Sequence, residues 1–205
     1  MKRIVLTAVL AGSLVPLGAV QADDEGFYLG FGFGPDRYSV HAADYDDGSL
    51  TSMSADATSR AFRLFGGYGF NPNLALEVFV TDLGETTFNG QSSGGSYWCA
   101  GPTYSRVSAD GIGMAAVGRL PLGESGFSLF AKGGIFSWDW SSVIRDSCGP
   151  FRDSDSGANP MFGGGVSYAF NYVTSLQLQW ERYTHIIDSH DVDALTLGLS
   201  FNLNY

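Results

Sequence analysis

The last thirteen residues of the chain, Asp193 to Tyr205, alternate between large apolar side chains and small or polar ones. The apolar positions are Leu195, Leu197, Leu199, Phe201, Leu203 and Tyr205, and the positions between them are Ala194, Thr196, Gly198, Ser200, Asn202 and Asn204. Because successive side chains of a β-strand point to opposite faces, this segment predicts a strand with one apolar and one polar face. The apolar face either fills the core of a soluble protein or contacts lipid, and that choice constrains the whole fold.

The start of the chain has the pattern of an export signal. A basic pair, Lys2-Arg3, precedes the apolar stretch Ile4 to Leu10, and the small-residue motif Val20-Gln21-Ala22 follows as a cleavage site. This order is typical of a secretory signal peptide. We therefore expect residues 1–22 to be removed and residues 23–205 to form one exported domain.

Composition limits how the exported part could enter a membrane. After the signal, no stretch approaches the ~18 consecutive apolar residues of a membrane helix, so a spanning chain must be a closed barrel. Glycine at 28 of 205 residues and an aromatic fraction of 14% favour strands and tight turns. The formal net charge of −10 argues against nucleic acid as a partner and predicts repulsion from anionic surfaces unless divalent cations intervene.

Eight segments with alternating character follow one another along the exported part. They cover residues 26–40, 59–70, 74–85, 105–120, 126–140, 160–170, 174–186 and 193–205. The connections between them are alternately long and short, with long polar connections at 41–57, 86–104 and 141–156. Long outer loops and short periplasmic turns are typical of an up-and-down transmembrane barrel. The sequence therefore predicts an all-β, eight-stranded antiparallel up-and-down transmembrane β-barrel; a soluble, lipocalin-like barrel with its faces inverted is the alternative.

The two cysteines, Cys99 and Cys148, lie in the second and third long connections. The up-and-down order places both connections at the same end of the barrel. Exported proteins meet oxidising conditions, so we expect a disulfide between these two residues.

Five charged residues fall on the polar faces of the predicted strands. They are Arg63, Glu77, Arg119, Lys132 and Glu181. If the apolar faces contact lipid, these side chains lie inside the barrel, where an unpaired charge is costly. The interior of an eight-stranded barrel is just wide enough to be filled by side chains. We therefore expect these charges to pair across the lumen.

Four segments of the exported part follow a known family pattern: Met161 to Phe170, Leu176 to Tyr183, Ala75 to Gly84 and Asp191 to Phe201. On these segments the chain resembles the OmpA-like family of small outer-membrane barrels. The family implies an outer-membrane location in a Gram-negative bacterium, contact with membrane lipid and lipopolysaccharide, and folding by the barrel-assembly machinery. A monomer is expected.

Details of the family pattern hold only in part. The final strand, with Phe201, Leu203 and Tyr205, resembles the family's assembly signal, although phenylalanine is the commoner last residue. In the archetype, acid–base pairs plug the lumen. Glu77 matches one such acid and Lys132 roughly matches a basic neighbour, whereas Ser167 and Gln177 stand where the archetype has an acid and an arginine. The resemblance therefore does not imply the channel mechanism of the archetype for this chain.

The residue patterns that could indicate a catalytic site or a metal site are weaker. One polar cluster, which loosely resembles a lipid A deacylase, comprises His185, Asp188, Ser189, His190 and Asp191. Its spacing differs from that of the deacylase and the expected asparagine is missing, so a polar loop is favoured. Two acidic runs resemble partial EF-hand loops: Asp44, Asp46 and Asp47 before Gly48, and Asp153 and Asp155 before Gly157. Neither places a glutamate at the twelfth position (Ala55 and Gly164 stand there), so we expect no metal and no cofactor.

These observations predict a non-enzymatic integral outer-membrane protein that contributes to envelope structure and presents surface loops. Two alternatives stay open from the sequence. One is an outer-membrane enzyme that modifies lipid A, with His185 and Ser189 as candidates. The other is a narrow pore. A weak divalent-cation bridge from loop carboxylates to lipopolysaccharide is also open.

Overall fold

A computed structural model describes residues 25–39, 48–56, 58–96, 98–187 and 190–204. The expected signal peptide, residues 1–22, lies outside these ranges. The strands are β1 (Gly26–Tyr38), β2 (Leu50–Asp56), β3 (Thr58–Asn71), β4 (Leu74–Ser92), β5 (Gly101–Pro121), β6 (Phe127–Asp146), β7 (Gly149–Ala169), β8 (Thr174–Ile187) and β9 (His190–Asn202). Within the described residues, no helix is long and apolar enough to cross a membrane.

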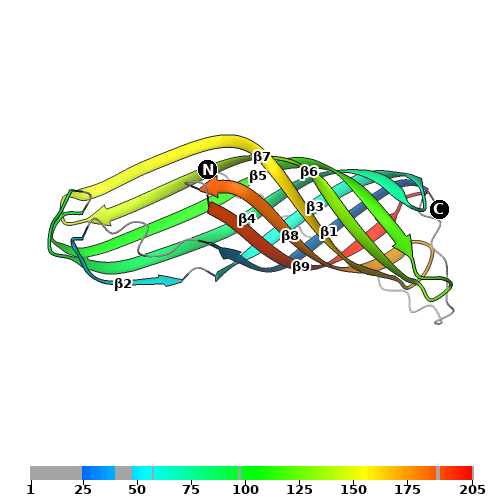
Figure 1. The fold of residues 1–205 in the computed structure, drawn as a ribbon, viewed down its shortest axis with the longest axis horizontal. Coiled ribbons are helices and arrows are strands. Elements are labelled where there is room, and N and C mark those ends of the chain that lie inside the picture. Colours follow the sequence, from blue (N-terminus) through cyan, green and yellow to red (C-terminus); the bar gives the residue numbers. More distant parts are fainter. Residues whose placement is uncertain (1–24, 40–47, 57, 97, 188–189, 205) are drawn as a thin grey trace.

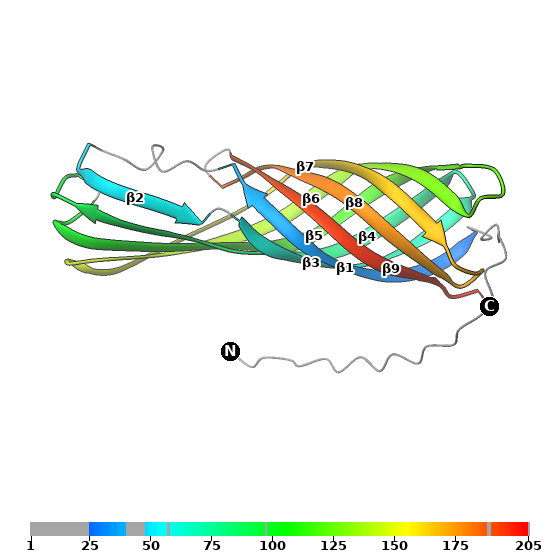
Figure 2. The same cartoon turned by 90° about the horizontal axis from the view of Figure 1, so that it is seen from below.

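Eight of these strands form a closed antiparallel ring. The order around it is β1, β3, β4, β5, β6, β7, β8 and β9, and β9 pairs back with β1. Strand β2 stands outside the ring and pairs only with β4. Figures 1 and 2 show the barrel as a cylinder whose strands are tilted relative to its long axis. The predicted all-β, eight-stranded antiparallel up-and-down barrel is confirmed.

The two faces of the closed barrel sheet are inverted relative to a soluble protein. Large apolar side chains point outward and are exposed, such as Leu197 at 48% and Ile135 at 62%. Charged side chains point inward and are buried, such as Arg63 at 0% and Lys132 at 5%. An outer apolar band with a polar interior is the arrangement that lipid requires.

Asparagine side chains close two of the short turns. Asn71 Oδ1 accepts from the amide of Asn73 at 2.9 Å, and Asn171 Oδ1 accepts from the amides of Val173 and Thr174, both at 2.8 Å. These side-chain bonds imitate a backbone turn. They explain why the connections at this end of the barrel stay short.

At the opposite end, four strands continue far beyond the ring. β4 runs on to Ser92, β5 begins at Gly101, β6 runs on to Asp146 and β7 begins at Gly149. With β2 they form a one-sided sheet, which we call the wall; it is the long arm in Figures 1 and 2. The predicted loops at 86–104 and 141–156 were therefore wrong over most of their length. Outside lipid both faces of a strand can be polar, so the alternation that marked the other strands is lost.

The outer part of β7, residues 149–160, is one edge of the wall. No strand in the described residues pairs with its outer side, because β8 joins β7 only further along. Two amides on this edge are capped by side chains: Ser154 N donates to Asp153 Oδ1 at 2.9 Å, and Ser156 N donates to Asp155 Oδ1 at 2.8 Å.

Two prolines add to the protection of this edge. Pro150 and Pro160 have the same parity as the capped serines, so their nitrogens, which carry no hydrogen, face the open side. Unpaired amides on a sheet edge invite pairing with another chain. Capped amides and prolines therefore make this edge a poor template for strand addition.

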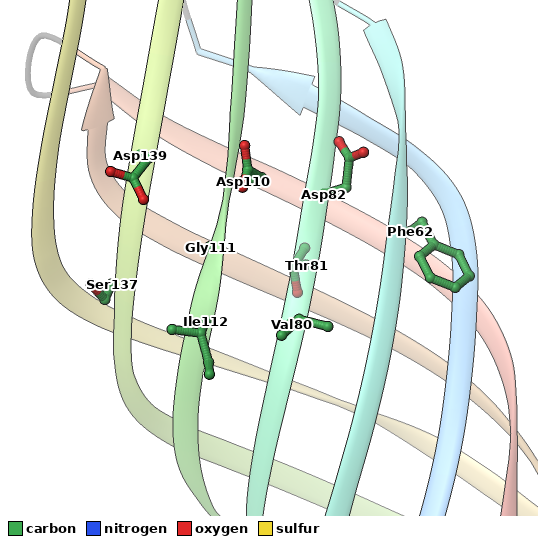
Figure 3. Close-up of a pocket in the computed structure, with 9 residues that line it drawn as sticks. All are labelled: Phe62, Val80, Thr81, Asp82, Asp110, Gly111, Ile112, Ser137 and Asp139. Carbon is green, nitrogen blue, oxygen red and sulfur yellow. The ribbon is translucent and has the colours of Figure 1, made fainter. Parts of the chain in front are cut away.

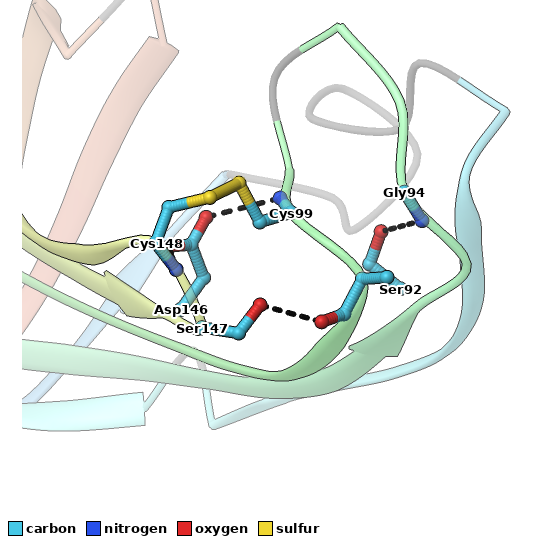
Figure 4. Close-up of a disulfide and its surroundings, with 7 residues drawn as sticks. Ser92, Gly94, Cys99, Asp146, Ser147 and Cys148 are labelled. Atoms are coloured by element: carbon cyan, nitrogen blue, oxygen red, sulfur yellow. Dashed lines mark hydrogen bonds between the residues drawn. A yellow bond between two sulfur atoms is a disulfide. The ribbon is translucent and has the colours of Figure 1, made fainter.

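A disulfide joins the β4–β5 connection to the β6–β7 connection at the tip of the wall. It links Cys99 to Cys148, whose Cα atoms are 6.0 Å apart (Figure 4). The Asp146 carboxylate accepts from both cysteine amides, at 3.1 Å from Cys99 N and 2.9 Å from Cys148 N. The two sulfurs are bonded to each other, so the close approach of Asp146 does not make a thiolate metal site.

Candidate functional site

A network of four charged side chains crosses the lumen. Arg63 Nη2 lies 2.6 Å from Glu77 Oε1, and Arg63 Nη1 lies 2.7 Å from Glu181 Oε1. Lys132 Nζ lies 3.0 Å from Glu77 Oε1 and 3.4 Å from Glu181 Oε1. Every one of these side chains is at most 4% exposed. Two acids and two bases balance, so the network is formally neutral.

Strand register explains how these side chains meet. The four residues come from β3, β4, β6 and β8, and each points inward by the parity of its strand. Gly163 of β7 lies directly between Lys132 and Glu181 in the ladder. A side chain at Gly163 would strike the Trp180 backbone and the Glu181 side chain, so this glycine leaves room for the charges on either side.

Neutral polar groups satisfy most of the remaining donors and acceptors, whereas Arg63 Nε is buried without a hydrogen-bond partner. Arg63 Nη1 donates to Tyr183 Oη at 3.0 Å, and that hydroxyl donates to Glu181 Oε2 at 3.0 Å. Lys132 Nζ donates to Gln179 Oε1 at 2.9 Å, and Gln179 Nε2 donates to Thr196 Oγ1 at 3.0 Å. Buried ion pairs are tolerated when such bonds surround them.

Aromatic rings pack against the network and fill the lumen around it. The Arg63 guanidinium carbon lies 3.6 Å from the centroid of the Phe79 ring, within cation–π range. Phe79 stacks on Phe136 at 6.0 Å, and Phe136 lies 4.7 Å from Tyr183. All four side chains are buried. The arrangement can cross-link the strands of the barrel and block the lumen; it offers no activated nucleophile.

Arg119, also predicted inside, lies beside the network, next to Tyr28, whose hydroxyl donates to Glu77 Oε2 at 3.4 Å. Its guanidinium carbon lies 4.8 Å from the Tyr28 ring centroid, and it lines a small cavity of about 30 Å³ near the short-turn end. The predicted interior charges therefore separate into four that meet and one that does not.

A row of carboxylates marks the end of the outer apolar band. Asp82, Asp110 and Asp139 are directly opposite one another on β4, β5 and β6. They lie just beyond Val80 and Ile112 and line a groove of about 460 Å³ (Figure 3). Asp82 Oδ1 accepts from the amide of Gly84 at 2.8 Å. Like charges directly opposite on a sheet repel.

Comparison with known proteins agrees with this geometry. The family model described as "Outer membrane protein beta-barrel domain" matches residues 6–203.

The chain belongs to the outer-membrane β-barrel family.

Relatives and solved structures place it among small outer-membrane barrels. "Outer membrane protein A" of Salmonella typhi is 22% identical over 208 residues, which cover 98% of this chain and 55% of the relative. The protein of the same name from Klebsiella pneumoniae is 27% identical over 145 residues, which cover 67% of this chain and 39% of the relative. The chain thus spans about half the length of the Salmonella typhi relative and a smaller share of the Klebsiella pneumoniae relative.

Solved structures share the fold of this outer-membrane barrel at low identity. Ail of Yersinia pestis, in complex with the heparin analogue sucrose octasulfate, has a TM-score of 0.54 at 17% identity, covering 86% of this chain and 98% of Ail. OprG of Pseudomonas aeruginosa has a TM-score of 0.55 at 10% identity, covering 89% of this chain and 98% of OprG. The predicted family and outer-membrane location are confirmed, and the soluble alternative is excluded.

Within this outer-membrane barrel, the interior network differs from what the family resemblance suggested. Ser167 takes no part in it, and Gln177 Nε2 instead donates to Ser200 Oγ at 3.0 Å. The acid and the arginine come from Glu181 and Arg63. Parity identified both residues as interior charges, but only the register between distant strands shows that they meet.

The remaining candidate residues lie elsewhere. His185 is exposed, and its amide donates to Asp191 Oδ1 at 3.1 Å. Its suggested partner Ser189, with Asp188, lies outside the described residues, as do Asp44, Asp46 and Asp47. Asp153 and Asp155 belong to a strand rather than to a metal-binding loop.

The expected assembly signal occupies the last strand. Phe201 pairs with Leu29 of β1 and with Thr174 of β8, inside the closed sheet. Leu203 is exposed at 58% and its amide donates to Phe27 O at 2.8 Å. Tyr205 lies outside the described residues.

Proposed function

We propose that this protein is a non-enzymatic outer-membrane barrel with a sealed lumen, and that its work is to hold the wall at the cell surface. The observation that carries the proposal is the continuation of β4 to β7 beyond the apolar band as a paired sheet. A barrel that served only as an anchor would need no such extension.

The wall is built as a stiff structure. Its strands are hydrogen-bonded up to Asp146 and Gly149, and the Cys99–Cys148 disulfide ties its two outer connections together. A rigid scaffold that presents surface segments is a common way to carry binding residues. We propose that the wall presents such residues to the exterior and supports the envelope.

The outer-membrane location suggests which molecules the protein contacts. We propose that the barrel contacts outer-membrane lipid and lipopolysaccharide, is inserted by the barrel-assembly machinery through its last strand, and works as a monomer. The capped edge of β7 supports the monomer, because it disfavours strand addition from a second copy.

Conductance tests the sealed lumen. In planar bilayers the purified protein should show no conductance at moderate voltage. A variant in which Arg63, Glu77, Lys132 and Glu181 are all replaced by serine should conduct if it folds, because the charges that block the lumen are gone. Steady conductance of the unchanged protein would show that it is a pore.

Mass spectrometry of lipid A tests the non-enzymatic part. Lipid A from cells that express the protein should match lipid A from cells that lack it. A deacylated or acylated species that disappears with His185→Ala would show that the protein is an enzyme.

A further inference from the structure

The outer face of the wall carries three arginines in a chain of formal net charge −10. Arg106, Arg145 and Arg152 are all exposed and come from β5, β6 and β7. Val143 is directly opposite both Arg106 and Arg152, and Arg145 is directly opposite Tyr104. Directly opposed residues point to the same face of a sheet. The three guanidinium groups therefore share one face, which we call the arginine patch.

The register sets the size of the arginine patch. Arg145 is a diagonal neighbour of both Arg106 and Arg152, which places their Cα atoms roughly 7–8 Å apart. Arg106 and Arg152 are two strands apart, about 10 Å. Side chains as long as arginine can converge on one anionic group across such a triangle.

Local contacts leave the positive charge of this patch largely uncompensated. Arg106 Nε donates to Tyr104 Oη at 3.1 Å, and Arg106 Nη1 lies 3.4 Å from Glu85 Oε2, a pair in which both side chains are about half exposed. The hydrogen bond to Tyr104, followed by the Glu85 charge, raises the pKa of Arg106. In the described part of the chain, Arg145 and Arg152 form no ion pair.

Position along the strand shows what lies against this face. On β5, Arg106 precedes Asp110 by four residues, so the arginine patch stands about 13 Å beyond the acidic row that ends the apolar band. This separation exceeds the Debye length of ~8 Å at physiological salt. Dissolved ions therefore weaken the interaction between the acidic row and the arginine patch, and the carboxylates neutralise little of the patch's positive charge. The outer face of the wall continues the lipid-facing surface, so under the proposed function its neighbours at this height would be the sugars of lipopolysaccharide rather than acyl chains.

We propose that the arginine patch binds phosphate groups on the core sugars of the surrounding lipopolysaccharide. Arginine binds phosphate through paired, charge-assisted hydrogen bonds, and a planar guanidinium fits this geometry better than an ammonium does. The proposal rests on the proposed function in one respect: the wall stands outside the membrane. It identifies the residues and the chemistry by which the protein holds its lipid neighbours.

Titration of a soluble probe tests the proposal. The full chain, folded in phosphatidylcholine nanodiscs, is titrated by calorimetry with deacylated, phosphorylated core oligosaccharide. We expect saturable binding that weakens about tenfold in the triple variant R106Q/R145Q/R152Q, on the basis of a modest contribution from each exposed charge. The enzymatically dephosphorylated oligosaccharide should bind as weakly as the triple variant does.

A second variant controls for loss of positive charge elsewhere on the barrel. Arg37 and Arg60 are exposed near the end of the apolar band, outside the arginine patch. R37Q/R60Q should bind the oligosaccharide like the unchanged protein, and gel mobility before and after boiling shows that each variant is folded.

Three results would overturn the proposal: no binding by the unchanged protein, equal binding by the triple variant, or equal binding of the dephosphorylated sugar. Competition by inorganic phosphate at the same concentration as the oligosaccharide would also overturn it, since the patch would then bind any anion. None of these results bears on conductance, so failure here is distinguishable from failure of the sealed-barrel proposal.

Discussion

Arg63 and Glu77 face each other from neighbouring strands inside the barrel, with Nη2 and Oε1 2.6 Å apart and neither side chain more than 4% exposed. Each also contacts a member of a second buried pair, since Arg63 reaches Glu181 and Glu77 reaches Lys132. The stability of the barrel therefore depends on all four charges being present together.

Removing one charge should destabilise the barrel. Glu77→Gln leaves two buried cations with one carboxylate, and breaking a buried pair in this way costs about 3–5 kcal/mol. The unfolding midpoint in urea, measured in detergent micelles, should fall accordingly. Glu124→Gln, at an exposed position in a short turn, should leave the midpoint unchanged. Equal effects of the two changes would show that the network contributes nothing specific.

Uncapping the β7 edge should promote self-association. In Asp153→Ala/Asp155→Ala the amides of Ser154 and Ser156 lose their acceptors and become free to pair with another strand. Cross-linking and light scattering should then detect dimers or larger species at concentrations where the unchanged protein is monomeric. Asp139→Ala removes an exposed aspartate from β6, the strand paired with β7, and should stay monomeric. A monomeric double variant would mean that the prolines protect the edge alone.

Breaking the disulfide should loosen the wall and spare the barrel. For a loop of 49 residues between Cys99 and Cys148, the chain-entropy estimate is about 4 kcal/mol. Cys99→Ser/Cys148→Ser should be cut by protease near the tip of the wall at a rate at least tenfold higher. The change in gel mobility on boiling, which reports the closed ring, should persist. Its loss would mean that the wall and the barrel fold as one unit.

The acidic row should be a point of local repulsion. Asp110 lies directly between Asp82 and Asp139, so Asp110→Asn removes two like-charge contacts at once. We expect stabilisation of about 0.2–1 kcal/mol per contact at low salt. The gain in the urea midpoint should shrink as salt is raised to 1 M, where the Debye length falls to ~3 Å. A gain that does not depend on salt would point to a packing effect instead.

Sequence alone could predict the membrane-embedded part because lipid enforces strict alternation. Leu195, Leu197 and Leu199 face outward, and Arg63 and Glu181 face inward, as their parity requires. The same reasoning failed above the membrane. Thr86 and Thr87, or Ser141 and Ser142, are polar on both faces, so nothing in the pattern separates a strand from a loop there.

Pairing across the lumen could not be predicted either. Parity shows only that a side chain points inward, whereas contact depends on height along the barrel and on which strands are opposite. Lys132 and Glu77 are 55 positions apart in the chain and meet only because β4, β5 and β6 are held in one register. Arg119 shares their parity but lies nearer the short-turn end, over the ring of Tyr28, whose hydroxyl donates to Glu77 Oε2 at 3.4 Å.

Since the wall rises from β4 to β7, with β2 beside β4, the molecule has a tall flank and a low flank. A neighbour approaching along β8, β9 or β1 passes over a short rim, whereas one approaching along β5 or β6 meets a barrier. In a crowded leaflet this asymmetry makes the two sides of the protein different. The contacts that a neighbouring molecule makes therefore depend on how the protein is rotated about the membrane normal.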